Sequence, residues 1–190
     1  GKPMGAFADL VIFSTAPTKQ IGSAGSGGMV AMWEKSLWDG VESYKRYGLS
    51  AETKEKSPDF AGHTVEGYML RMTPVEAAVL NVKLKYLPAW TEKRKQIAGW
   101  YVERLQDVEG VRLPVLRPES EPVYREFPLM VRDRDVVKSV MREMGVQGNT
   151  NYNPPVHQRP VYQKHRYPGG ENLPVTEALS KELLTLPVDP

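Results

Sequence analysis

The sequence has no cysteine among its 190 residues. This excludes a disulfide framework, a thiolate metal site and a cysteine nucleophile. Histidine is also scarce: the chain has three, His63, His157 and His165, and no two of them are four residues apart. Because helical zinc sites favour such pairs, often with cysteine beside them, we predict no metal site. A chain without cysteine is compatible with a reducing compartment, so we expect a cytoplasmic protein.

The chain also lacks a long apolar run and an excess of charge of either sign. No window approaches the length that a membrane-spanning segment needs. The 25 Lys and Arg residues nearly balance the 23 Asp and Glu residues, for a formal net charge of +2. A charge so small and so well mixed does not indicate a nucleic-acid partner. We therefore expect neither a membrane nor a nucleic acid as a partner.

What remains is the composition of a globular protein, 41% hydrophobic and 25% charged. The length suits one large domain or parts of two. Short apolar runs predict strands, and apolar residues at helical spacing predict helices. The predicted strands are residues 8–13, 29–33, 111–116 and 124–131, and the predicted helices are residues 34–47, 73–87, 89–105, 135–144 and 173–186.

Local signals place the helix ends and the loops. Thr73, Pro74 and Glu76 combine a capping box with a proline at the first helical position. Pro88 is expected to break or kink the helix that they begin. The polar residues 48–66 predict a long exposed loop, residues 149–172 predict irregular structure, and the pattern changes near residue 107.

A single lysine, Lys19, stands in a turn between an apolar strand and a glycine-rich loop (residues 13–32, FSTAPTKQIGSAGSGGMVAM). A phosphate-binding P-loop is rejected, because Gly28 and Met29 stand where the motif needs Lys and Ser or Thr. The dinucleotide pattern that begins at Gly25 fails at Val30. The serine-hydrolase motif G-x-S-x-G is absent as well.

Two interpretations of Lys19 then remain. A lysine in a fixed, partly buried turn can form a Schiff base with an aldehyde, such as that of pyridoxal phosphate. Ser14, at the end of the strand, would add a hydroxyl to the backbone N–H groups that bind a phosphate. The simpler interpretation is a solvated turn lysine followed by a hairpin. Local physics favours the simpler one, because surface turn lysines are common.

Motifs along the whole chain, in the right order, resemble the DegT/StrS family of sugar aminotransferases. The first is F-S-x-x-P-T-K, which occupies residues 13–19 and ends at Lys19. It is followed by Gly-Gly and the start of an apolar strand at residues 27–30. The lead-in GAFAD resembles the family's G-S-F-G-D. The other matching segments are residues 67–73 (GYMLRMT) with 76–78 (EAA), residues 154–162 (PPVHQRPVY), and residues 173–177 (LPVTE) with 186–187 (LP).

The resemblance implies an α/β fold of the aspartate-aminotransferase-like kind, fold type I of the pyridoxal-phosphate transferases. Residues 1–106 would be the C-terminal part of the large cofactor-binding domain with the connecting helices, and residues 107–190 the small α+β domain. Lys19 would be the catalytic Schiff-base lysine that also moves the proton, and Ser14 a ligand of the cofactor phosphate. The implied reaction transfers an amino group, commonly from glutamate, to a keto-sugar that is usually nucleotide-linked. The implied assembly is a homodimer.

The sequence also departs from the family pattern. Met69 replaces an Asn that, in the family, reaches the cofactor phosphate of the neighbouring subunit. The loop before Gly27 is slightly longer than usual and lacks a Glu. The family places an Asp for the pyridinium nitrogen and an aromatic residue for the ring in a segment that would precede Gly1. We therefore expect the chain to be the C-terminal part of a longer enzyme that cannot run the reaction alone.

Two further interpretations stay open. One is a non-catalytic, dimerising or regulatory relative, favoured by Met69 and opposed by Lys19. The other is a pyridoxal-phosphate-dependent sugar dehydratase, although the related dehydratases carry His where Lys19 stands.

A proline-flanked cationic loop is the candidate substrate site. Tyr152, His157 and Arg159 would form a rim for the diphosphate of a nucleotide sugar, because charge-assisted hydrogen bonds hold phosphates well. A solvated surface loop explains the same residues equally well. Arg71 is interpreted as an anchor of the helix entry rather than as a catalytic group.

Overall fold

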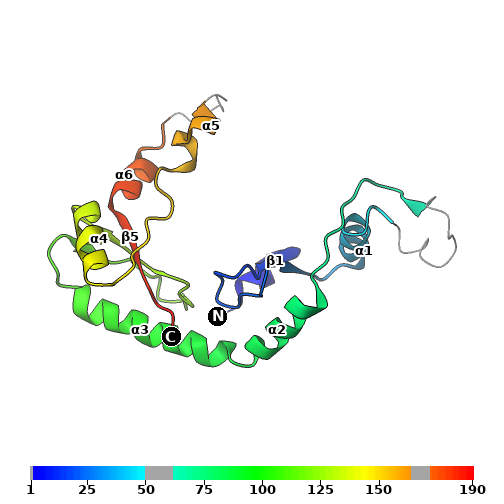
Figure 1. Cartoon of the computed structure of the whole chain (residues 1–190), viewed down its shortest axis with the longest axis horizontal. Coiled ribbons are helices and arrows are strands. Elements are labelled where there is room, and N and C mark those ends of the chain that lie inside the picture. The colour runs from blue at the N-terminus through cyan, green and yellow to red at the C-terminus, as the bar shows by residue number, and fades with distance from the viewer. Residues whose placement is uncertain (1, 50–61, 164–171) are drawn as a thin grey trace. The chain divides into compact units, whose positions relative to one another are not determined.

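The computed structural model describes residues 2–49, 62–163 and 172–190, and Figure 1 labels its α-helices and the strands β1 and β5. They form two compact units, Gly1–Pro88 and Ala89–Pro190. The middle of the predicted exposed loop (residues 50–61) and His165 lie outside the described residues. Along the chain, the boundary between the two units falls in the first turn of the helix α3 (Leu87–Leu105), whereas the predicted transition near residue 107 follows the end of that helix. The division into residues 1–106 and 107–190 stays a prediction.

The first unit contains a two-stranded antiparallel hairpin. Its strands pair from Leu10 opposite Met32 to Ser14 opposite Gly28, which confirms the two predicted strands to within two residues. The loop that joins them carries Lys19 at the end of the hairpin where Ser14 lies. The elements of this part are η1 (Met4–Phe7), a 3-10 turn, β1 (Leu10–Ser14) and β2 (Gly28–Met32).

The helices of the first unit are α1 (Lys35–Tyr44) and α2 (Pro74–Leu84). The predicted capping box at the start of α2 is confirmed. The Glu76 N–H donates to the Thr73 hydroxyl at 3.3 Å, and the Thr73 N–H donates to the Glu76 carboxylate at 2.9 Å. The hydrogen bonds from the backbone and the hydroxyl of Thr73 lower the pKa of Glu76 below its ordinary value. The start of α2 is therefore fixed by local chemistry alone.

Pro88 does not interrupt a helix. The break falls at residues 85 and 86, and α3 begins at Leu87, so Pro88 stands in its first turn. There the missing N–H removes no helical hydrogen bond.

The second unit has one hydrophobic core on a three-stranded antiparallel sheet of order β3-β4-β5. Its central strand, β4, buries Phe127, Leu129 and Val131, as expected of a strand with one face on a core. Side chains of α3 and α4 pack against this face, and the rings of Tyr101 and Phe127 lie 5.2 Å apart. The elements are β3 (Val111–Arg112), β4 (Phe127–Val131), α4 (Arg134–Glu143) and β5 (Leu183–Leu186).

The prediction of one helix over residues 173–186 is wrong in its second half. The helix α6 (Pro174–Glu182) is followed at once by β5, which pairs with β4. Arg134, which is only 4% exposed, lies at this change. Its guanidinium donates to the carbonyls of Ser180 at 2.9 Å and Leu183 at 3.1 Å, which satisfies groups that the end of the helix leaves without partners.

Between α4 and α6 the chain forms two short helical turns, η4 (Val156–Gln158) and α5 (Pro160–Gln163), inside the segment predicted as irregular. The predicted helix 135–144 is confirmed as α4, and Gly145 follows it with a φ of 80°. The strands β3 and β4 are shorter than the predicted 111–116 and 124–131.

Candidate active site

Lys19 lies in a tight turn that follows β1. Its N–H donates to the carbonyl of Ala16 at 2.9 Å, which closes the turn through Pro17 and Thr18. Lys19 is half-buried, and among the described residues none accepts a hydrogen bond from its ammonium group. The turn therefore presents a primary amine whose backbone is fixed.

The glycine-rich loop folds back onto this turn. A Cβ atom on Gly22 would lie 2.4 Å from the carbonyl oxygen of Pro17, so only glycine allows this approach. The Ser23 N–H donates to the carbonyl of Thr15 at 2.8 Å, and the single hydroxyl proton of Ser23 is shared between the carbonyls of Gly25 at 2.5 Å and Thr15 at 2.9 Å. The ammonium of Lys83, on α2, donates to the carbonyl of Gly22 at 2.6 Å. The loop is thus tied to both the hairpin and α2.

Two hydroxyl groups lie at the end of β1. Ser14 is exposed, and the residue opposite it, Gly28, has no side chain to cover it. The next residue, Thr15, is fully buried, and its hydroxyl has no hydrogen-bond partner within the described part of the chain. A Cβ atom on Gly27 would lie 3.2 Å from that hydroxyl. Ser14 is the hydroxyl that a bound ligand can reach.

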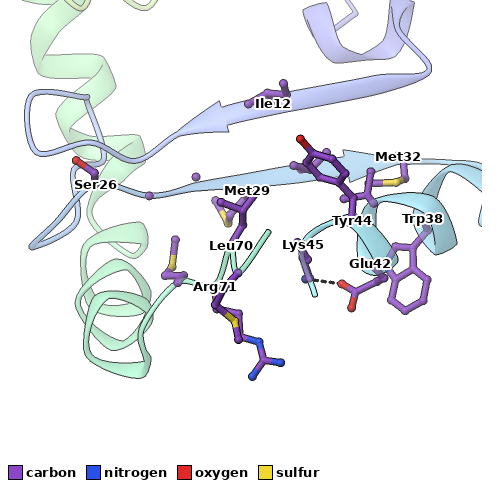
Figure 2. A pocket seen from close by; sticks show the side chains of 16 residues that line it. Ile12, Ser26, Met29, Met32, Trp38, Glu42, Tyr44, Lys45, Leu70 and Arg71 are labelled. Atoms are coloured by element: carbon purple, nitrogen blue, oxygen red, sulfur yellow. Dashed lines mark ion pairs between the residues drawn. The ribbon is translucent and has the colours of Figure 1, made fainter. Parts of the chain in front are cut away.

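A pocket of about 910 Å³ lies in the same unit, lined from the hairpin, α1 and the segment before α2 (Figure 2). Neither Lys19 nor Ser14 lines it. Its walls are largely apolar, with Arg71 and an ion pair between Lys45 and Glu42 as charged groups. The other lining residues are Ile12, Ser26, Gly27, Gly28, Met29, Val30, Met32, Trp38, Val41, Tyr44, Met69, Leu70 and Met72.

Met69 lies in the wall of this pocket and is 46% exposed. Its segment is tied to the end of α1 by main-chain hydrogen bonds. The Tyr68 N–H donates to the main-chain carbonyl of Tyr44 at 2.8 Å, and the Leu70 N–H donates to the main-chain carbonyl of Lys45 at 3.1 Å. The backbone at Met69 is therefore held in place, while its thioether offers no hydrogen-bond donor.

The predicted substrate-binding residues belong to the second unit and are described separately from Lys19. Tyr152 is 68% exposed, and Arg159 is exposed just after η4. The ring of His157 is largely covered, and its Nε2 lies 3.1 Å from Oε1 of Glu177 on α6. This hydrogen bond is the main cause that holds the pKa of Glu177 below its ordinary value. His157 is thus already engaged by a side chain of its own unit.

The model of the DegT/DnrJ/EryC1/StrS aminotransferase family matches residues 1–190. The chain belongs to this family.

Curated relatives match all of this DegT/DnrJ/EryC1/StrS chain. It is 34% identical over 190 residues to the erythromycin biosynthesis sensory transduction protein EryC1 of Saccharopolyspora erythraea, of which it covers 50%. It is 30% identical over 190 residues to the dTDP-3-amino-3,4,6-trideoxy-alpha-D-glucose transaminase of Streptomyces venezuelae, of which it covers 48%. The chain spans about half the length of these relatives.

Solved structures of aminotransferases share its fold. The structure of S. venezuelae DesV in complex with a ketimine intermediate matches with a TM-score of 0.83 at 30% identity, over 95% of this chain and 46% of that one. The structure of NtdA from Bacillus subtilis with bound cofactor PMP matches with a TM-score of 0.82 at 26% identity, over 99% of this chain and 43% of that one. The predicted fold class, an α/β fold of type I, is confirmed.

The donor set of the Lys19 turn fits the cofactor that such a family member would bind. An aldehyde requires an amine without a competing partner, and the Lys19 ammonium meets this condition within the described residues. A phosphate requires accessible donors, and the exposed hydroxyl of Ser14 is one. No other lysine of the first unit combines a closed turn with a strand-end hydroxyl among the residues described.

Sequence reasoning missed two groups at this site. The buried hydroxyl of Thr15 has no sequence motif that would indicate it. The contact of Lys83 with Gly22 joins residues 61 positions apart, so no local pattern predicts it. The described ranges contain no group of three or more His, Cys, Asp or Glu residues arranged to hold a metal. Within the same ranges no helix is long and apolar enough to cross a membrane.

Proposed function

We propose that this chain is the part of a pyridoxal-phosphate-dependent sugar aminotransferase that carries the cofactor lysine. The whole protein would transfer an amino group, from glutamate as donor, to a keto-sugar linked to a nucleotide. The names of several relatives support this substrate class, among them the dTDP-sugar transaminase of S. venezuelae. A second is the UDP-N-acetyl-3-dehydro-alpha-D-glucosamine 3-aminotransferase of Acidithiobacillus ferrooxidans.

The observation that carries the proposal is the placement of Lys19. Its amine follows the end of a strand through a closed turn, and the exposed hydroxyl of Ser14 stands five residues earlier at that strand end. This arrangement occurs in a chain that belongs to an aminotransferase family along its whole length.

The two side chains would have different roles. Pyridoxal phosphate supplies an aldehyde that links covalently to an amine and an electron sink for charge on the neighbouring carbon. Lys19 would hold the cofactor through its amine, and the same amine would carry the proton between substrate and cofactor carbons. Ser14 would donate a hydrogen bond to the phosphate and so orient the ring.

Tyr152, His157 and Arg159 are proposed to bind the substrate. Tyr152 and Arg159 are exposed and can offer a phenol and a guanidinium to a diphosphate. His157 is proposed to act with its partner Glu177, which orients the ring through the 3.1 Å contact.

Reductive trapping tests the role of Lys19. In the protein at its full natural length, pyridoxal phosphate should give a visible absorbance band, and borohydride should convert the complex into a stable adduct. Peptide mapping should place that adduct on Lys19. The Lys19→Ala variant should lose the band and turnover, whereas Lys35→Ala, at an exposed lysine of α1, should keep both.

Two results would contradict the proposal. One is an adduct that maps to another lysine. The other is full turnover of a keto-sugar by the Lys19→Ala variant.

A second candidate function is a non-catalytic regulatory relative that keeps the fold. Met69, which removes a donor from the pocket wall, favours it. Two relatives carry regulatory names, the sensory transduction protein of S. erythraea and the pleiotropic regulatory protein of Geobacillus stearothermophilus. Cofactor binding without turnover of any keto-sugar would support this candidate.

A further inference from the structure

One face of α2 runs along the glycine-rich loop that follows Lys19. Glu76, Leu80 and Lys83 are spaced by four and three residues, so they share this face. At one end, a Cβ atom on Gly25 would lie 2.3 Å from the Glu76 carboxylate, which shows how closely the loop approaches. Leu80 is 6% exposed. At the other end, the Lys83 ammonium donates to the carbonyl of Gly22 at 2.6 Å.

The residue that Lys83 contacts is the one that packs on the Lys19 turn. Gly22 approaches Pro17 so closely that a Cβ atom would lie 2.4 Å from the Pro17 carbonyl oxygen. The next residue, Ser23, donates its N–H to the Thr15 carbonyl, and its hydroxyl lies within hydrogen-bond distance of the carbonyls of both Thr15 and Gly25. The peptide of Gly22 and Ser23 therefore braces the segment from Thr15 to Pro17, which leads into Lys19.

Lys83 is a side chain outside the hairpin loop that holds this peptide through the Gly22 carbonyl. A hydrogen bond from an ammonium to a carbonyl is stronger than one between neutral groups, and 2.6 Å is short for its kind. Lys83 is half-buried, so water competes less for its ammonium than at an exposed lysine. It also lies in the last turn of α2, where a cation stabilises the helix.

We propose that Lys83 is a positioning residue for Lys19. It acts through the Gly22 carbonyl to hold the loop against the turn, so that the Lys19 amine is presented to the cofactor aldehyde in one geometry. Fixing the geometry of a reacting group raises the rate of its reaction without any change in its chemistry. This inference rests on the proposed function, because it takes Lys19 as the cofactor lysine.

Hydrogen exchange tests the brace in the cofactor-free protein at its full natural length. The Lys83→Met variant keeps the aliphatic stem but loses the ammonium. Exchange at the amides of Lys19 and Ser23 should become about tenfold faster, as expected when one charge-assisted hydrogen bond is lost. The Lys83→Arg variant, which keeps a cation and its donors, should stay close to the original protein. Lys85→Met, at an exposed lysine two residues away, is the matched control.

The rate of the visible absorbance rise on adding pyridoxal phosphate tests the consequence for Lys19. Lys83→Met should slow this rise about tenfold, because fewer molecules hold the amine in place at any moment. Lys83→Arg should restore the rate, and Lys85→Met should not change it. If Lys83→Met does not fold, Lys83→Leu, which also lacks a donor, takes its place in both measurements.

The outcomes separate this inference from the proposed function. If Lys83→Met matches Lys85→Met in exchange and in rate while Lys19 still forms the adduct, the positioning role is overturned and the proposed function stands. If exchange speeds up throughout the first unit instead of within residues 15–27, Lys83 is a general stabilising residue and the inference is also overturned. If the original protein forms no adduct at Lys19, the proposed function fails; faster exchange confined to residues 15–27 would then still support the brace alone.

Discussion

At the scale of single residues, the side chain at position 69 determines whether its segment can donate a hydrogen bond to a ligand. The backbone there is held by hydrogen bonds of the adjacent Tyr68 and Leu70 to the end of α1. The position is therefore well ordered for a polar contact, yet Met69 has only a thioether, a weak acceptor. In the family pattern an Asn at this place reaches the cofactor phosphate of the neighbouring subunit.

We expect Met69→Asn to tighten pyridoxal phosphate binding in the protein at its full natural length. An amide that donates to the phosphate adds a charge-assisted hydrogen bond of about 1.5–3 kcal/mol. That corresponds to roughly tenfold or more in the dissociation constant. Ser14→Ala should weaken binding by a similar factor, because it removes a hydroxyl donor from the same phosphate. Fluorescence titration of the cofactor measures both changes.

The pair of variants is informative in combination. An unchanged affinity for Met69→Asn together with a weaker one for Ser14→Ala would mean that another group holds the phosphate from the neighbouring subunit. If neither variant changes the affinity, the hairpin does not hold the phosphate, and the regulatory candidate is favoured.

At the scale of elements, a side-chain contact joins η4 to α6. His157 lies in η4, and its partner Glu177 lies in the first turn of α6. The hydrogen bond from His157 is the main cause that lowers the pKa of Glu177. A carboxyl group whose pKa is lower in the folded state stabilises the fold above its ordinary pKa. It loses that contribution as the pH falls through the lowered value.

We therefore expect Glu177→Gln to flatten the acid side of the stability profile. In the original protein, the free energy of unfolding of the second unit should fall as Glu177 takes up a proton below its ordinary pKa. The variant has no carboxyl group to titrate there, so its stability should depend less on pH in that range. Denaturant unfolding at a series of acidic pH values measures the difference. The control Glu143→Gln changes an exposed carboxylate at the end of α4 and should give the same dependence of the unfolding free energy on pH as the original protein. If Glu177→Gln also gives that same dependence, the prediction is wrong.

Elements set by local chemistry could be predicted from the sequence, and those set by distant contacts could not. The start of α2 follows from Thr73 and Glu76, which are three residues apart. The strand over residues 183–186 does not follow from the sequence, because its Leu-rich residues also suit a helix and the pairing with β4 is what makes them a strand. The candidate site shows the same contrast: Lys19 and Ser14 lie in one short motif and stay a prediction, whereas the contact of Lys83 with Gly22 spans 61 positions and has no sequence signal.

At the scale of the whole molecule, the resemblance to the family predicts that two copies of the full protein build each active site. The segment from Gly67 to Thr73 would then lie at the interface between copies. Its exposed apolar side chains, Tyr68, Met69 and Leu70, are consistent with a surface that a second copy covers.

We expect the protein at its full natural length to be a dimer at micromolar concentration. Leu70→Asp should weaken that dimer by placing a charge in the predicted interface. Leu84→Asp is the matched control, since Leu84 and Leu70 are both 55% exposed. Light scattering over a dilution series measures the dissociation. A monomer with full activity would rule out an active site shared between copies.

The residues that form the core of the second unit are synthesised at different times. Its central strand, β4, is made early in this unit, but its partner β5 and the buried Val188 come only after α4, η4, α5 and α6. Until β5 leaves the ribosome, Phe127 and Leu129 have no neighbouring strand at the edge of β4 that pairs with β5. During synthesis the half-made unit therefore exposes an apolar strand with an open edge, the kind of surface that chaperones bind and that aggregates when left uncovered. A chain truncated before Leu183 lacks β5, so the edge of β4 that pairs with β5 stays exposed.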